Sequence, residues 1–402
     1  MKNLNKFLFT KEDMSVTERI GGYFFWFAFL FEIIYMIFKR IGYDLPLETY
    51  WLRALTFCFG IKVLFTRYTR KEWLFVVAGG LLGIVAYAYS GQDIIFRVYA
   101  MVAASKNISK RSAVKGLLIS LCISYTIVVV RGVMGIGGPI VDVRDYGRGE
   151  IETRYSLGFS HANGLHMSIW TLLALGLYLY DSKMKAWGYA AVVLFDLLIF
   201  YFTRSRTGFL IILFMAVAAF WTKYVQKKKS WFTLAGGVSL LTVVLGLSYV
   251  AQKYEIGVCF PKIMIPLNNM LTNRFQLAHE QASIIWYYYT PIRLFMPKGI
   301  PVDSIDMGYV SCFYAYGIVY GVMLVCALLM LFVRAWKQNQ RMEMVLLLCI
   351  ILYYFIEATQ TSTLYVTQNF VWLLLMDSWY NRKSNQEEFY LQELPKGIRT
   401  WR

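Results

Sequence analysis

The chain has 402 residues, of which 58% are hydrophobic and only 16% are charged. Several apolar stretches exceed the roughly 18 residues that suffice to cross a bilayer, so the composition excludes an ordinary soluble domain. It predicts an all-α polytopic membrane protein. The formal net charge of +17 does not indicate nucleic-acid binding, because the basic residues are dispersed among short loops and form no single basic face.

The apolar segments predict twelve membrane spans within one integral membrane domain over residues 1–402. In chain order they lie at about 20–38, 50–66, 73–90, 93–104, 114–134, 162–180, 186–203, 207–224, 231–251, 309–333, 342–357 and 364–380. An even number of spans places both termini on one side. That side holds roughly twice as many loop and tail Lys and Arg residues as the other, so both termini are predicted to be cytoplasmic.

Two long segments then lie outside the membrane on the far side, at 135–160 and 252–308. The second is predicted to be a large extracytoplasmic loop that acts as a lid over a site. It contains apolar residues at a 4-3-4-3-4 spacing, which predicts an amphipathic helix. These residues are Leu271, Phe275, Ala278, Ala282, Ile285 and Tyr289.

Several arginines lie in predicted outer loops, where the positive-inside rule disfavours them. Arg144, Arg148 and Arg154 crowd one outer loop, and Arg204 and Arg206 fill the next one, in "FTRSRTGF". Three more, in the outer third of predicted spans, are Arg53, Arg97 and Arg131. Snorkelling, or ion pairing with Glu32 and Glu357, is the structural alternative. A guanidinium stays protonated and binds phosphate oxygens in a bidentate fork, so a diphosphate is the predicted guest. The candidate ligands are Arg97, Arg131, Arg148, Arg154, Arg204, Arg206 and Arg274.

The stretch "RYSLGFSHANGLHMSIW" places scarce polar residues at the mouth of a predicted helix. Ser160 or Asn163 is expected to cap that helix, whose N-terminal N–H groups favour anions. His161 lies just outside it and is a further candidate for binding, as is Asn163. The alternative is that Asn163 is only a cap and His161 only a polar surface residue. One turn inside, His166 is predicted to be a buried hydrogen-bond partner.

Four segments resemble, in order, the signatures of the O-antigen polymerase and ligase superfamily of bacterial membrane glycosyltransferases. They are "RYSLGFSHANGLHMSIW", "FTRSRTGFLIILF", "LTNRFQLA" and "DMGYVSCFYAYGIVYGVML". The chain has Ala162 where the family often has Pro and Asn273 where it often has Gly, as in a distant member.

The resemblance implies a multi-pass protein of the bacterial cytoplasmic (inner) membrane. Its donor and acceptor would be polyprenyl-diphosphate-linked glycans, with no nucleotide sugar, metal or other cofactor and no nucleic acid. A chain-length regulator and a flippase of the same pathway are the implied protein partners.

Glycosyl transfer needs a group that takes a proton from the acceptor hydroxyl. The outer-loop candidates are His279, Glu280, Asp303 and Asp306. The resemblance favours His279, with Asp306 second; surface solvation or helix capping is the alternative for each. On a regular helix Arg274 and His279 are about 140° apart, so they cannot both point at one small group.

Two classes of function fit these patterns. The first is a polysaccharide polymerase, or a ligase that transfers the glycan to another acceptor. The second is a flippase or transporter for the same lipids, which is expected to carry charge near the bilayer midplane, as at Asp196. The outward clustering of the arginines favours the enzyme.

Overall fold

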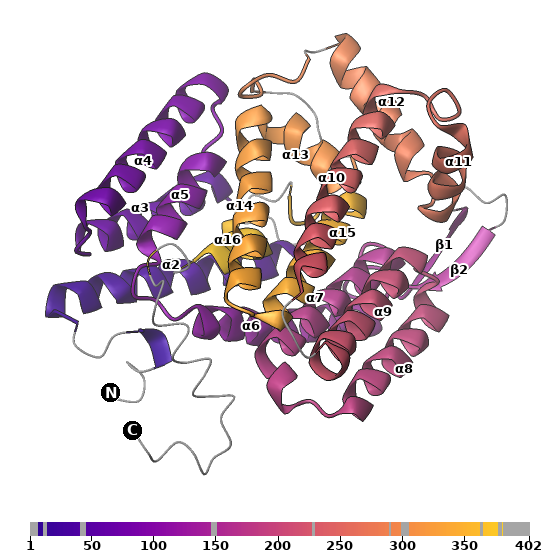
Figure 1. Cartoon of the computed structure of the whole chain (residues 1–402), viewed down its shortest axis with the longest axis horizontal. Helices are drawn as coiled ribbons and strands as arrows, with labels where there is room; N and C mark the ends of the chain where they lie inside the picture. Colours follow the sequence, from indigo (N-terminus) through magenta and orange to yellow (C-terminus); the bar gives the residue numbers. More distant parts are fainter. Residues whose placement is uncertain are drawn as a thin grey trace.

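The structure is a computed structural model, and its mostly helical chain is drawn in Figure 1. The residues that it describes are 7–10, 14–40, 46–145, 151–226, 230–288, 291–298, 305–361, 365–376 and 380.

Within the described residues, eight helices are long and apolar enough to cross a membrane. They are α2 (Val16–Arg40), α4 (Arg70–Ser90), α6 (Lys110–Val133), α7 (Ala162–Tyr180), α8 (Ala186–Thr203), α9 (Arg206–Phe220, continued by the π-turn η2, Trp221–Val225), α10 (Trp231–Lys253) and α14 (Ile318–Lys337). These eight helices indicate a multi-pass membrane protein, as the composition predicts.

The other four predicted spans correspond to shorter helices, so the count of twelve is not reproduced. These helices are α3 (Glu48–Leu64), α5 (Ile94–Ala104), α15 (Arg341–Ile356) and α16 (Phe370–Leu375), the last preceded by the 3₁₀ turn η3 (Val366–Gln368). All six residues of α16 are buried. Apolar composition predicted this last segment as a span because a buried core segment and a lipid-facing one have the same hydropathy.

The predicted span at 309–333 is divided into α13 (Gly308–Tyr316) and α14 by Gly317. Gly317 has a φ of 96°, and a Cβ added there would lie 2.6 Å from the carbonyl oxygen of Leu294. The backbone N–H groups of Ile318 and Val319 donate to the carbonyls of Arg293 and Leu294. A segment from the 252–308 region therefore satisfies the backbone where the helix breaks.

A two-stranded hairpin lies within the segment 135–160, where the all-α prediction has no strand. Strand β1 (Val141–Asp145) pairs antiparallel with β2 (Ile151–Tyr155). Its polar pair faces inward: Asp142 lies opposite Arg154, and both are buried. The short run alternates polar and apolar residues, but the alternation is inverted relative to a soluble hairpin. Because the buried face of this hairpin is polar, its sequence does not show the apolar buried face by which a strand is usually recognised.

The predicted amphipathic helix is present as α12 (Arg274–Tyr288), which follows α11 (Pro261–Met270) and packs against α10. Its apolar stripe from Leu271 to Ile285 is buried, whereas Tyr289 lies outside the described residues. Figure 1 shows α11, α12 and the hairpin near one another at the upper right.

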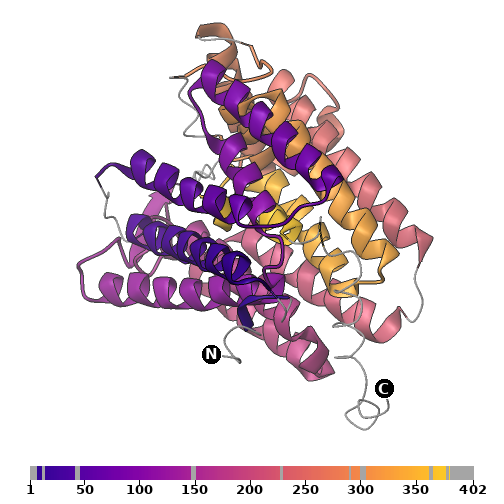
Figure 2. The same ribbon diagram turned by 90° about the vertical axis from the view of Figure 1, so that its left-hand side faces the viewer.

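The core lies where α7, α9 and α15 pack together. Trp170 of α7 stacks on Tyr353 of α15 with ring centroids 4.2 Å apart, and Phe370 of α16 lies against the same indole. In Figure 2, α2 and α6 run side by side, in keeping with their packing. Helix α4, in contrast, packs on α5 and leaves most of its surface exposed, as expected of a lipid-facing helix.

Candidate functional site

The turn between α8 and α9 presents two free guanidinium groups. Arg204 closes α8 in the left-handed conformation (φ 53°), and Ser205 caps α9 by accepting a hydrogen bond from the N–H of Gly208. Arg206 is the first residue of α9. Both arginines are exposed, and neither side chain makes a hydrogen bond or ion pair with any described residue. Within the described part of the chain, the turn therefore offers two guanidinium groups without a counter-charge.

His161 caps α7, in place of the expected Ser160 or Asn163. Its Nδ1 accepts the N–H of Gly164 at 2.9 Å. Since an accepting Nδ1 carries no proton, the neutral ring has its proton on Nε2 and can donate from there. A ring nitrogen can serve as a cap much as an oxygen does, but the usual cap preferences favour Ser and Asn.

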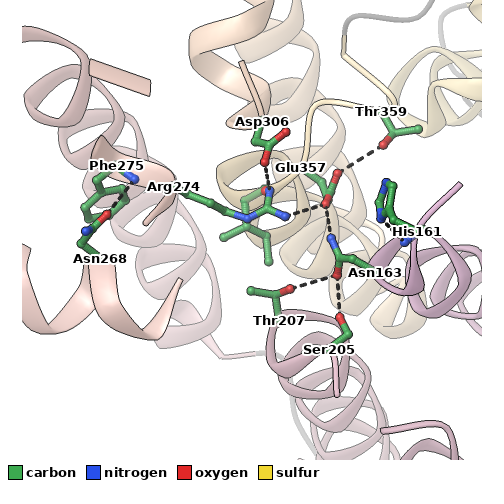
Figure 3. Close-up of polar contacts among 12 residues, drawn as sticks. His161, Asn163, Ser205, Thr207, Asn268, Arg274, Phe275, Asp306, Glu357 and Thr359 are labelled. Atoms are coloured by element: carbon green, nitrogen blue, oxygen red, sulfur yellow. Dashed lines mark hydrogen bonds and ion pairs between the residues drawn. The ribbon is translucent and has the colours of Figure 1, made fainter. Parts of the chain in front are cut away.

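Asn163, released from capping, connects three helices. Its amide nitrogen donates to Glu357 Oε1 at 2.7 Å, and its carbonyl oxygen accepts from Ser205 Oγ at 2.5 Å and from Thr207 Oγ1 at 3.4 Å (Figure 3). The start of α7 is thereby fixed against the arginine turn and against the end of α15.

Arg274 enters the site from the first residue of α12. Thr272 and Asn273 are both left-handed, and the side-chain oxygen of Asn268 accepts the N–H groups of Phe275 and Gln276. This tight turn fixes the helix start and directs the guanidinium inward.

The Arg274 guanidinium is buried and ion-paired. It lies 2.9 Å from Glu357 Oε1 and 3.8 Å from Asp306 Oδ2, and it also donates to the carbonyl of Ile356. Burial alone would lower the pKa of Arg274, but attraction to Glu357 and Asp306 outweighs it and raises that pKa above its ordinary value. Arg274 is therefore a permanent cation in the wall of the site.

Glu357 is the residue on which these contacts converge. It follows the last residue of α15, and its Oε1 accepts from both Arg274 and Asn163, whereas its Oε2 accepts from Thr359 Oγ1 at 3.3 Å (Figure 3). From the sequence alone, Glu357 is only a possible ion-pair partner. Its signal in the sequence is a carboxylate directly after a long apolar run, "LLLCIILYYFIE".

These residues enclose a chamber of about 400 Å³, called the basic chamber below. Its lining residues are Arg154, His161, Asn163, Arg204, Ser205, Arg206, Thr207, Thr272, Arg274, Leu277, Asp306 and Glu357. The structure thus brings together seven predicted site residues: Arg154, His161, Asn163, Arg204, Arg206, Arg274 and Asp306. Four guanidinium groups face two carboxylates across the space, so the chamber favours an anion.

Arg154 differs from the turn arginines because it is already paired. Its Nη2 and Nε both lie within 3.0 Å of Glu152 Oε2, and its side chain is buried beneath the hairpin. It adds positive charge to the chamber wall, but its fork is partly occupied.

Three other predicted residues lie elsewhere. Arg97 forms a buried ion pair with Glu32 at 2.8 Å, the structural alternative considered for it. Arg131 donates to the carbonyl of Ile136 at the end of α6 and does not line the chamber. His279 projects toward α10, where its Nδ1 lies 3.2 Å from the carbonyl of Gln252, so the angular separation from Arg274 takes it out of the site. Arg148 lies outside the described residues.

A buried polar network supports the arginine turn from below. His166 Nε2 lies 2.8 Å from Asp196 Oδ1, and His166 Nδ1 lies 2.8 Å from Thr203 Oγ1. The Thr203 hydroxyl donates to the carbonyl of Ile199, so it accepts from His166. The His166–Asp196 pair carries no net charge whether its shared proton is on the ring or on the carboxyl, which suits its complete burial.

The network gives Asp196 a structural partner, and substitutions separate this role from proton or ion transport. Asp196→Asn is expected to keep the bond to His166 and full function, because its amide can donate to Nε2. Asp196→Leu should lower the free energy of unfolding by about 1–3 kcal/mol, because it leaves the buried ring nitrogen of His166 without a hydrogen bond. Thermal unfolding in detergent measures the stability of both variants, and an activity assay compares each with the wild type. An inactive but fully stable Asp196→Asn protein would favour a carrier that needs a titrating carboxyl.

No protein-family model, curated protein or solved structure matches the chain. Within the described residues there is no group of three or more His, Cys, Asp or Glu side chains that could hold a metal ion.

Proposed function

We propose that the protein is a membrane glycosyltransferase that polymerises polyprenyl-diphosphate-linked oligosaccharide repeat units into a surface polysaccharide. The observation that supports it most is that Arg204 and Arg206, whose side chains have no counter-charge among the described residues, line one chamber of about 400 Å³ together with the buried Arg274. A diphosphate has two phosphoryl groups for bidentate forks, and the chamber's excess of guanidinium groups matches its charge.

The transfer would occur in one displacement. The acceptor hydroxyl oxygen forms a bond to the anomeric carbon of the donor, and the bond from that carbon to the diphosphate oxygen breaks. The electron pair leaves with the diphosphate, which gains a negative charge, and the hydroxyl proton passes to a carboxylate. Arg204, Arg206 and Arg274 would stabilise the charge that develops on the leaving diphosphate. Asp306 and Glu357 are the carboxylates within reach of the chamber.

A ligase that transfers the glycan to a different acceptor would use the same chamber. The function is tested by supplying the purified protein, in lipid nanodiscs, with lipid-linked repeat units from the source cells. A ladder of products differing by one repeat unit supports the polymerase, whereas a single transfer to a second acceptor supports the ligase. Recovery of only unchanged lipid-linked units, moved across the bilayer of proteoliposomes, would support the flippase alternative.

The proposed reaction takes place on the outer face of the bacterial cytoplasmic membrane, with both termini in the cytoplasm. This topology predicts that cysteines replacing Lys262 and Lys298, in a background without other thiols, react with an impermeant maleimide in intact cells. The outer membrane, if present, is permeabilised first. Labelling that requires lysis of the cytoplasmic membrane would reverse the topology and remove the chamber from the lipid-linked glycan.

A further inference from the structure

A second and larger cavity adjoins the basic chamber. It has a volume of about 540 Å³ and extends between α2, α6, α7, α15 and α16. His161 and Glu357 line both spaces, so they form the shared wall. The arginines of the chamber, in contrast, do not line the second cavity.

The lining of this cavity has the chemistry of a saccharide site. Aromatic rings from three helices and two connecting segments reach it, together with hydroxyl and amide groups. The rings are those of Tyr125, Phe159, Tyr353, Tyr365 and Phe370, and the polar groups are those of Ser160, Ser168, Thr171, Thr359, Gln360 and Gln368. Aromatic faces pack against the C–H faces of a sugar ring, while hydroxyls and amides bind its hydroxyl groups without introducing charge.

The two oxygens of Glu357 have different surroundings. Oε1 accepts from Arg274 and from Asn163, the contacts that fix the carboxylate in place (Figure 3). Among the described residues, Oε2 accepts only the longer hydrogen bond from Thr359, which itself lines the second cavity. A carboxylate oxygen can accept more than one hydrogen bond, so Oε2 can receive a further hydroxyl. Asp306 lines the chamber but not the second cavity, so it lacks this position between two sites.

We infer that the second cavity binds the terminal sugar of the acceptor glycan and that Glu357 takes the proton from its attacking hydroxyl. The inference rests on the proposed function, with the donor diphosphate in the basic chamber. The hydroxyl proton passes to Glu357 Oε2 as the oxygen bonds to the anomeric carbon, and the diphosphate departs with the electron pair of the broken bond. The Nε2–H of His161, on the same wall, is placed to bind a sugar oxygen.

Two cavity-filling substitutions test the acceptor subsite. Ser168→Phe fills it from α7 and Leu121→Trp from α6, and Ile123→Trp on the exposed face of α6 is the matched control. Each filling variant should lower polymer formation by about 100-fold, because the acceptor no longer reaches the donor. Binding of sugar-free polyprenyl diphosphate to the purified variants in nanodiscs should stay at the wild-type level, which also reports that the protein is folded.

The activity and binding of the filling variants together show whether the second cavity holds the acceptor or the donor. Full-length polymer from either well-expressed filling variant would overturn the acceptor subsite, and loss of polyprenyl diphosphate binding in both would assign the cavity to the donor and overturn it as well. The proposed function fails separately, if the double variant Arg204→Ala/Arg206→Ala binds polyprenyl diphosphate like the wild type.

The proton acceptor is tested by isosteric amides. Glu357→Gln keeps an oxygen for Arg274 and Asn163 and turns an NH2 group toward the Thr359 hydroxyl, which can accept from it. The amide cannot take a proton, so transfer should fall about 10²–10⁴-fold while polyprenyl diphosphate still binds. Glu255→Gln, the same substitution at an exposed residue that lines neither cavity, is the matched control and should retain the activity. Normal transfer by Glu357→Gln, or equal losses in the two variants, would remove Glu357 from this role.

Discussion

Replacing Arg204 or Arg206 by alanine is expected to reduce polymer formation by a hundredfold or more. Removing one donor that stabilises the charge developing on a leaving group costs about 2.7–4 kcal/mol of transition-state stabilisation. Lysine should give an intermediate activity, because it keeps the charge and loses the bidentate fork. A gel of surface polysaccharide should change from a long ladder to one or a few repeat units.

The structure makes these two arginines the cleanest test of the diphosphate proposal. Since neither side chain has a partner among the described residues, truncating them to alanine should leave the protein level and unfolding temperature unchanged. Arg154 and Arg274 are poorer choices, because alanine there would strand Glu152 or Glu357. Full-length ladders from well-expressed Arg204→Ala and Arg206→Ala proteins would reject the diphosphate site.

Loss of Arg97 should affect stability rather than chemistry. Its guanidinium is 2% exposed and pairs with Glu32, which is 1% exposed. Arg97→Met leaves a buried carboxylate without its counter-charge, and breaking such a pair costs about 3–5 kcal/mol. The expected result is a large drop in protein level and in thermal stability in detergent.

The double variant Arg97→Met/Glu32→Gln is the control for that prediction. Both charges are removed together, and the glutamine oxygen can still accept the N–H of Val366, which Glu32 accepts at 2.9 Å. Stability and polymer formation should both recover. A double variant that is stable but inactive would support the sequence-based prediction that Arg97 binds the substrate.

The local sequence was sufficient for features that depend on neighbouring residues. Apolar length determined the membrane-crossing helices, and the spacing of Phe275, Ala278 and Ala282 determined the buried face of α12. The excess of arginine in "FTRSRTGF" also singled out the α8–α9 turn. Each of these depends on helix geometry or on a short turn, which a chain encodes within a few residues.

Only the tertiary structure decided which polar groups meet. Arg97 and Arg274 have the same charge and both were candidates, yet one is neutralised by Glu32 inside the bundle and the other faces the chamber. Glu357 reaches Asn163 from 194 positions away along the chain. His279 lies away from the chamber because α12 packs on α10 with that face. Partners so distant in sequence are set by how helices pack, since hydropathy predicts burial but does not specify which buried charge lies beside which.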